Sequence, residues 1–462
     1  MLKKEQLLFY SNRSKVRKIY KPLLNKNNKF LESLADYLYN NFVKKALTML
    51  YVLKRLKKFN LLLYLFNLYK DYFIAFIQIK LLSYKKLLLI KNSNIKIIKK
   101  NKIYCKEKIV VKNNVLNEKY SEFKKDYFSS EIYLTKIKDC FFYTNIDLIF
   151  HSKTNYIYND NNITKDFILP EEYDKLSITT ILSPRKLNKL YDPTKGINLN
   201  NIFYINSRLV LNYSHWLLEF LPKIVIFYSD KKNLDIPMTI NSDIHKNCLQ
   251  QILLFNRKIK IILVKPYLKI NAKTIHHITP VSDIPFNYRT EKSFLKNLFS
   301  FNKFSKKPYK ILRNLFIKKK ELLKYKQKYL GAKVYLSRKA KYRLIKNEIE
   351  IININAKKGY LIKDPVKLLM EEQIALFYYS KIIVTASGSS MANLIFSGKS
   401  LKLVYLASDC KKHGYHFYPR LANVANPDLK ILQFLGNKTN SVHESYSIDT
   451  IKYINFLNEN DL

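Results

Sequence analysis

Apolar positions follow a helical period early in the chain. Between residues 31 and 90, large apolar side chains recur about every 3.6 residues, which is typical of an amphipathic helix. These positions are Leu31, Leu34, Leu38, Phe42, Met49, Leu53 and Leu56. Two interpretations stay open for this basic segment. It is either a helical arm that lies on an anionic membrane or partner, or a helical hairpin that packs on its own domain.

From residue 200 onward, apolar runs of strand length alternate with amphipathic runs of helix length, after a strand-rich but motif-free stretch over 95–200. Strands are predicted at Asn201–Asn206, Lys258–Val264, Ala332–Ser337, Ile349–Ile354, Lys381–Ala386 and Leu401–Leu406. Helices are predicted at His215–Ser229, Ile244–Phe255, Glu291–Phe299, Val366–Ser380 and Ser389–Ser397. The alternation predicts an α/β fold with parallel sheets.

The same pattern suggests three parts. We expect a basic, largely helical extension over residues 1–130, an α/β domain over 131–300 and a second α/β domain over 301–462. The segment Phe301–Gln327, rich in Lys and Asn, is the expected hinge. For the helix predicted at Val366–Ser380, Asp364 is the predicted N-cap and Pro365 the first helical residue.

The expected compartment is the cytoplasm. The N-terminus has no apolar stretch of signal-peptide length. Between residues 30 and 100 the longest uncharged run, Phe59–Tyr69, has 11 residues, whereas a membrane-spanning helix needs about 20. The four cysteines lie far apart and form no zinc or redox motif. We therefore expect free thiols and no transmembrane segment.

A net charge of +48 raises the possibility of a nucleic-acid partner. Of the 83 basic residues, however, 72 are Lys and only 11 are Arg, the residue better suited to bidentate phosphate and guanine contacts. The Lys residues are also spread along the whole chain, together with abundant Ile, Asn, Tyr and Phe. This pattern favours a codon bias towards A and T over a polyanionic partner. A basic nucleic-acid-binding protein remains the alternative.

The first candidate site surrounds the single tryptophan. Trp216 follows His215 in the segment Asn212–Pro222, NYSHWLLEFLP. If His215 opens a helix, Glu219 lies four residues later on the same face. A histidine steered by a carboxylate is suited to be a general base, because an imidazole titrates near neutral pH. The alternative is a structural histidine beside a core tryptophan.

The second candidate site follows a predicted strand. Ser337 and Arg338 would lie at its carboxyl end, where open α/β sheets bind ligands, and Arg343 follows five residues later. Two arginines there would hold a diphosphate and stabilise its charge as it leaves. The alternative is a solvated basic turn.

The third candidate site is a loop of small residues, Ser387, Gly388, Ser389 and Ser390, between an apolar strand and a helix. The free N–H groups and the dipole of a helix start favour an anion. The loop lacks the glycine spacing and the lysine of a Walker or dinucleotide motif. An ordinary tight turn is the alternative.

In order and spacing, these segments resemble glycosyltransferase family 61, whose bacterial members are often described as capsular polysaccharide biosynthesis proteins. The resemblance covers residues 200–425 and rests on Asn212, His215, Trp216, Glu219, Leu221, Pro222, Ser337, Arg338, Arg343, Asn347, Glu348, Glu372, Gln373, Phe377, Asn393 and Phe396. Family members commonly carry a His-Gly-Ala/Ser core in the last loop, preceded by another Gly. Here those positions read Thr385, Ser387, Gly388 and Ser389. This departure raises three alternatives: a changed donor sugar, a shifted catalytic contact, or a divergent member with weak activity. A transferase-like fold without activity is a further possibility.

The resemblance implies a GT-B-like fold of two Rossmann-like domains, with the acceptor bound by the N-terminal one and the donor by the C-terminal one. It implies an inverting, nucleotide-sugar-dependent glycosyltransferase that needs no metal or other cofactor and acts on a glycan or lipid-linked acceptor in surface polysaccharide synthesis. Association with an anionic membrane surface is compatible with it, and no nucleic acid is expected.

The resemblance also implies roles for individual residues. The candidate bases are His215, Glu219 and Glu348, with Glu372 as a further alternative. The residues expected to bind the donor are Ser337, Arg338, Arg343, Asn347, Glu372, Gln373, Ser387, Gly388, Ser389, Ser390 and Asn393.

Overall fold

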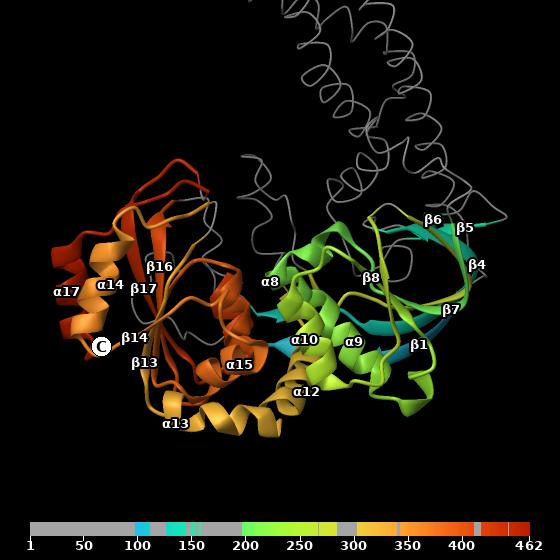
Figure 1. Cartoon of the computed structure of the whole chain (residues 1–462), viewed down its shortest axis with the longest axis horizontal. Coiled ribbons are helices and arrows are strands. Elements are labelled where there is room, and N and C mark those ends of the chain that lie inside the picture. The colour runs from blue at the N-terminus through green and yellow to red at the C-terminus, as the bar shows by residue number, and fades with distance from the viewer. Residues whose placement is uncertain are drawn as a thin grey trace, which may run out of the picture. The chain divides into compact units, whose positions relative to one another are not determined.

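The chain divides into two compact units, Met1–Lys85 and Lys86–Leu462. The computed structural model describes parts of the second unit, namely residues 98–110, 126–144, 149–152, 157–158, 196–266, 268–283, 303–339, 342–410, 417–441 and 443–462. Figure 1 colours these residues by their position in the sequence. The helical segment predicted over 31–90 and the helix predicted at Glu291–Phe299 lie outside the described residues.

The first sheet has the order β6-β5-β4-β10-β7-β8-β9, and β1 pairs with β4 beside β5. Its strands are β1 (Ile98–Tyr104), β4 (Ile132–Tyr143), β5 (Ile149–His151), β6 (Ile157–Tyr158), β7 (Ile197–Tyr204), β8 (Met238–Asn241), β9 (Ile261–Val264) and β10 (Lys269–Ile278). The neighbours β9, β8, β7 and β10 run parallel, whereas β4 is antiparallel to β10. Two short antiparallel pairs join β2 (Lys108–Ile109) to β3 (Tyr127–Phe128) and β11 (Ser282–Asp283) to β12 (Lys303–Phe304).

The second sheet is entirely parallel and has the order β14-β13-β15-β16-β17. Its strands are β13 (Lys333–Leu336), β14 (Leu361–Lys363), β15 (Ile382–Ala386), β16 (Lys402–Asp409) and β17 (Lys430–Lys438). After β13 the chain adds β14 on one side, and after β15 it adds β16 and β17 on the other side. The carboxyl ends of these two strands therefore form the topological switch point, where sheets of this kind bind ligands.

Helices that follow strands of the first sheet and helices that follow strands of the second sheet pack into one continuous apolar core. They are α8 (Tyr213–His215), α9 (Leu221–Tyr228), α10 (Lys246–Phe255), α12 (Lys306–Ile317), α13 (Lys326–Tyr329), α15 (Met370–Tyr379), the 3₁₀ helix η10 (Ser389–Phe396) and α16 (Phe417–Ala425). Leu218, Leu312, Leu394 and Leu421 all lie in this cluster. On the opposite face of the second sheet, α14 (Glu348–Lys357) and α17 (Thr450–Glu459) cover a separate cluster. The predicted α/β fold with parallel sheets is confirmed.

The strand predicted at Ile349–Ile354 is wrong, because these residues belong to α14. Their β-branched side chains favour a strand. Ile351 and Asn355 are nevertheless both fully buried, and their spacing of four residues matches a helix face. Glu348 and Glu350 lie in the first helical turn, where negative charge is favourable. Packing and charge therefore override the strand propensity.

The predicted start of the helix at Val366 is also wrong, because α15 begins at Met370. Asp364 does accept a hydrogen bond from the Val366 N–H at 3.1 Å, but it closes a turn instead of capping a helix. The side chain of Gln373 stabilises this turn by donating to the Pro365 carbonyl at 2.8 Å. The helix predicted at Ser389–Ser397 forms as the 3₁₀ helix η10.

The expected hinge at Phe301–Gln327 contains β12, α12 and the 3₁₀ helix η9 (Lys320–Tyr325). Tyr309, Leu312 and Phe316 follow a helical period and are fully buried in the shared core. This helical period is hard to see in the sequence because lysine is abundant around it. None of the helices that the structure describes has both the length and the apolar content of a membrane span.

Candidate active site

His215 and Glu219 form a buried pair on one helical segment. His215 ends α8, and its Nδ1 lies 3.2 Å from Glu219 Oε2, with side chains only 9% and 13% exposed. Glu219 lies in a short π-helical turn, η6 (Trp216–Phe220), and His215 directly precedes this turn. The Leu221 N–H donates to the Trp216 carbonyl five residues earlier. π-helical turns are rare and occur often at functional sites. The predicted contact between His215 and Glu219 is present.

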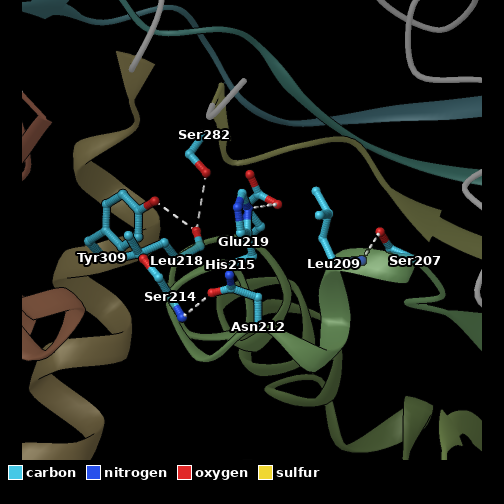
Figure 2. Close-up of polar contacts among 9 residues, drawn as sticks. All are labelled: Ser207, Leu209, Asn212, Ser214, His215, Leu218, Glu219, Ser282 and Tyr309. Atoms are coloured by element: carbon cyan, nitrogen blue, oxygen red, sulfur yellow. Dashed lines mark hydrogen bonds and ion pairs between the residues drawn. The ribbon is translucent and has the colours of Figure 1, made fainter. Parts of the chain in front are cut away.

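The proline that follows explains how this turn is held. Pro222 has no N–H, so the Leu218 carbonyl four residues earlier lacks its usual helical partner. Two hydroxyls replace it: Tyr309 donates to this carbonyl at 2.7 Å and Ser282 at 3.3 Å (Figure 2). Because Tyr309 belongs to α12 and Ser282 to β11, these bonds fix the histidine helix to two other elements.

A chain of buried polar side chains links the histidine helix to η10. The indole of Trp216 donates to Gln251 Oε1 at 2.6 Å, and Gln251 Nε2 donates to the Tyr213 hydroxyl at 3.4 Å. Tyr213 in turn donates to Asn393 Oδ1 at 2.8 Å, and Asn393 Nδ2 donates to Gln373 Oε1 at 3.2 Å. Trp216 therefore lies in the core. Asn393 and Gln373, predicted to bind the donor, are buried members of this internal chain.

Arg338 spans the switch point of the second sheet. It follows β13, and its backbone N–H donates to Glu348 Oε1 at 2.7 Å. Its Nε and Nη2 donate to the Tyr342 carbonyl at 3.3 and 3.2 Å. Its Nη1 lies against Gly388, where a Cβ atom would be only 1.7 Å away. The structure thus brings together the predicted residues Arg338, Gly388 and Glu348.

Arg343 adds a second positive charge beside the first. Burial, reinforced by the charge of Arg343, lowers the pKa of Arg338. Arg343 has a φ of 59°, a left-handed conformation uncommon for residues other than glycine, and its N–H donates to the His443 carbonyl at 3.2 Å. Within the described part of the chain, its buried Nε has no hydrogen-bond partner. Two neighbouring guanidinium groups in this state favour an anion between them.

Tyr418 completes this group and was missed from the sequence. Its hydroxyl donates to the Gly388 carbonyl at 3.0 Å. Burial raises its pKa, and the charges of Arg343 and Arg338 oppose that rise, which shows that the phenol lies near both arginines. Tyr418 follows Gly388 by 30 residues and belongs to none of the recognised motifs. In a chain with 36 tyrosines, it carried no signal of its own.

Three further predicted residues hold the backbone around the arginines. Glu348 also accepts a hydrogen bond from the Tyr335 hydroxyl at 3.2 Å, and burial raises its pKa. Ser337 donates its hydroxyl proton to the Lys363 carbonyl at 3.3 Å. Asn347 binds both backbone groups of Ile448, donating to the carbonyl at 2.8 Å and accepting from the N–H at 3.0 Å. These contacts are structural supports of the site.

The remaining predicted residues divide between the site and the surface. Ser387 is buried at the end of β15, and the half-buried Ser389 and Ser390 begin η10 beside the arginines. Glu372 lies elsewhere: its Oε1 accepts from Lys328 at 2.6 Å and from the Tyr329 hydroxyl at 2.7 Å. The structure therefore does not bring Glu372 into the arginine group.

Aromatic contacts join the two groups through the start of α16. The ring centroids of Tyr309 and Phe304 lie 6.0 Å apart, those of Phe304 and Phe417 5.3 Å, and those of Phe417 and Tyr418 5.0 Å. Tyr309 contacts the histidine helix and Tyr418 contacts the Gly388 loop. The histidine pair and the arginine pair therefore belong to one packed region.

The family model described as Glycosyltransferase 61 matches residues 213–424, a range that includes both groups of side chains. Among curated proteins, no match was found.

Proposed function

We propose that this chain, whose residues 213–424 match the Glycosyltransferase 61 family model, is an inverting enzyme that uses a nucleotide-sugar donor. The observation that carries the proposal is the pair Arg338 and Arg343 at the switch point of a parallel sheet. A nucleoside diphosphate supplies the negative charges that two adjacent guanidinium groups favour. The donor is therefore proposed to bind across the carboxyl ends of β13 and β15, where Gly388 leaves room for the Arg338 guanidinium.

The proposed reaction is a single displacement. The acceptor hydroxyl oxygen forms a bond to the anomeric carbon, while the bond between that carbon and the diphosphate oxygen breaks. The hydroxyl proton passes to His215, and the electron pair of the broken bond leaves with the diphosphate, whose charge Arg338 and Arg343 stabilise. His215 is the proposed base, and Glu219, whose Oε2 lies 3.2 Å from His215 Nδ1, is proposed to hold the imidazole in place.

The proposed architecture is GT-B-like, with two Rossmann-like halves. The part of the first sheet within residues 131–300 would bind the acceptor, and the second sheet, within residues 301–462, would bind the donor. Support comes from the parallel part of each sheet and from the strand order of the second. In this proposal Asn347, Gln373 and Asn393 stabilise the backbone around the donor site through internal hydrogen bonds. Glu348 positions Arg338.

We propose a glycan or lipid-linked acceptor in surface polysaccharide synthesis, on the cytoplasmic face of a membrane whose anionic surface attracts this basic chain. We assign the neutralisation of the diphosphate to the arginines and not to a metal ion. Transfer should accordingly survive treatment with EDTA, and a complete loss that added Mg²⁺ or Mn²⁺ restores would contradict this assignment.

The decisive experiment is a thermal-shift and calorimetric screen of the full chain against nucleoside diphosphates and nucleotide sugars. At least one nucleoside diphosphate should raise the melting temperature, and Arg338→Ala should weaken its binding by about ten- to a hundredfold. The exposed Arg257 gives a matched control, since Arg257→Ala removes the same charge elsewhere. Equal affinities in the two variants would overturn the proposal. Tight, steeply salt-dependent binding of oligonucleotides without any nucleotide effect would support a nucleic-acid-binding protein instead.

A further inference from the structure

The hydrogen bond between Tyr213 and Asn393 connects two functional segments. Tyr213 lies two residues before His215 on α8, and Asn393 lies five residues after Gly388 on η10. The 2.8 Å bond between them is partly buried. We propose that Tyr213 and Asn393 are positioning residues for sugar transfer, which fix the helix of His215 relative to the loop that binds the donor. This inference rests on the proposed function.

The direction of every bond in the buried chain is determined by its first member. The indole of Trp216 is a donor only, so Gln251 must present its oxygen to Trp216 and its NH₂ group to Tyr213. The Tyr213 hydroxyl accepts that bond and therefore donates to the Asn393 oxygen. The NH₂ group of Asn393 then points towards Gln373. No amide in the chain can flip without breaking a bond.

The same chain ends on the donor loop itself. Besides Gln373, the NH₂ group of Asn393 donates to the carbonyl of Ser390 at 3.0 Å. Ser390 is two residues after Gly388, within the first turn of η10. A shift of Tyr213 would therefore be transmitted to the backbone of the loop, and a shift of the loop would be transmitted to α8.

Apolar packing alone would not fix this relation. The two segments also share the hydrophobic core, but apolar contacts are non-directional and tolerate small sliding movements. A hydrogen bond weakens steeply when its length and angle change. Since a displacement of about 1 Å in a reacting group lowers turnover by about a hundredfold, the polar chain has a catalytic consequence beyond its contribution to stability.

The test compares Tyr213→Phe with Tyr228→Phe. Tyr213 is partly buried on α8 and Tyr228 is buried on α9, and the Tyr228 hydroxyl donates one bond of 2.8 Å, to the Ile236 carbonyl. Each variant keeps the ring and loses a buried hydroxyl, so similar falls in melting temperature are expected. Only Tyr213→Phe should lower kcat, by about tenfold, with a smaller change in the affinity for a nucleoside diphosphate. Equal kcat values in both variants would overturn the inference.

A second measurement separates this inference from the proposed function. The imidazole NMR signals of His215, assigned with a His215→Gln variant, report its surroundings without any turnover. Tyr213→Phe should shift these signals and Tyr228→Phe should leave them in place, whether or not sugar transfer is detected. Unshifted His215 signals in Tyr213→Phe would overturn the positioning role. A wild-type protein that neither binds a nucleoside diphosphate nor transfers sugar would overturn only the proposed function.

Discussion

The guanidinium of Arg338 occupies the space that a side chain on residue 388 would need. A Cβ atom on Gly388 would lie 1.7 Å from Arg338 Nη1, far inside any permitted contact. The backbone of Gly388 is extended, with a φ of −176°, so any residue could adopt its conformation. The requirement for glycine at this position is therefore steric, and it is set by a side chain from a different strand.

Gly388→Ala should consequently act through Arg338. The added methyl group forces the guanidinium away from the loop, and donor affinity should fall by about ten- to a hundredfold. Because both changes remove the same interaction, the double variant Gly388→Ala/Arg338→Ala should bind a nucleoside diphosphate no more weakly than Arg338→Ala alone. Calorimetric titration of the three variants measures this, and fully additive losses would show that the two residues act independently.

Tyr418→Phe should weaken donor binding by a smaller amount. The variant loses the hydrogen bond to the Gly388 carbonyl, a contact whose net contribution is about 1 kcal/mol, or about a fivefold change in affinity. Tyr360→Phe is the matched control, because the buried Tyr360 hydroxyl makes no hydrogen bond within the described residues. Calorimetry should find a normal donor affinity in the control, and an unchanged affinity in Tyr418→Phe would remove Tyr418 from the site.

The two hydroxyls on the Leu218 carbonyl should compensate for each other. Tyr309→Phe or Ser282→Ala alone leaves one donor in place, so each should lower the free energy of unfolding by about 1 kcal/mol. The double variant leaves a buried carbonyl without a partner, which costs about 1–3 kcal/mol more than the sum of the single changes. Urea denaturation of the four proteins gives the coupling energy, and simple additivity would contradict the shared role.

His276 should make the fold sensitive to acid. Burial, reinforced by the charge of Lys136, lowers the pKa of His276 to about 4 from 6.5. The folded state therefore favours the neutral ring. This stabilisation is fully present above the unfolded pKa of 6.5 and is lost as the pH falls towards 4. Melting temperatures measured across this window should fall more steeply for the wild type than for His276→Leu, and parallel curves would contradict the prediction.

The sequence was most informative where chemistry and periodicity agree. His215 and Glu219 share a helix face as their spacing predicts, and β13 delivers Arg338 to the carboxyl edge of a parallel sheet. In both cases the local pattern alone determines the geometry. The choice between strand and helix at Ile349–Ile354 depends instead on tertiary packing. Ile351 is buried, and acidic residues lie in the first turn of α14.

Contacts across long sequence separations could not be predicted in the same way. Gln373 and Asn393 were expected to bind the donor, yet their side chains belong to the buried chain that begins at Trp216. Tyr418 reaches Gly388 only because α16 packs against η10 and the Tyr418 ring contacts Tyr405 of β16. Such relations depend on tertiary packing, which no motif in a single sequence encodes.

The continuous core across both sheets limits how this protein can be divided. Leu218 and Leu394 belong to opposite halves but to the same buried cluster. A fragment that begins at residue 301 would keep both arginines, yet it would expose the apolar surface that α9 and α10 now cover. Such fragments should aggregate, and exchange of residues 301–462 between relatives should fail unless the core residues of α9 and α10 are exchanged with them. Any exchange of residues 301–462 between relatives therefore has to carry α9 and α10 along with it.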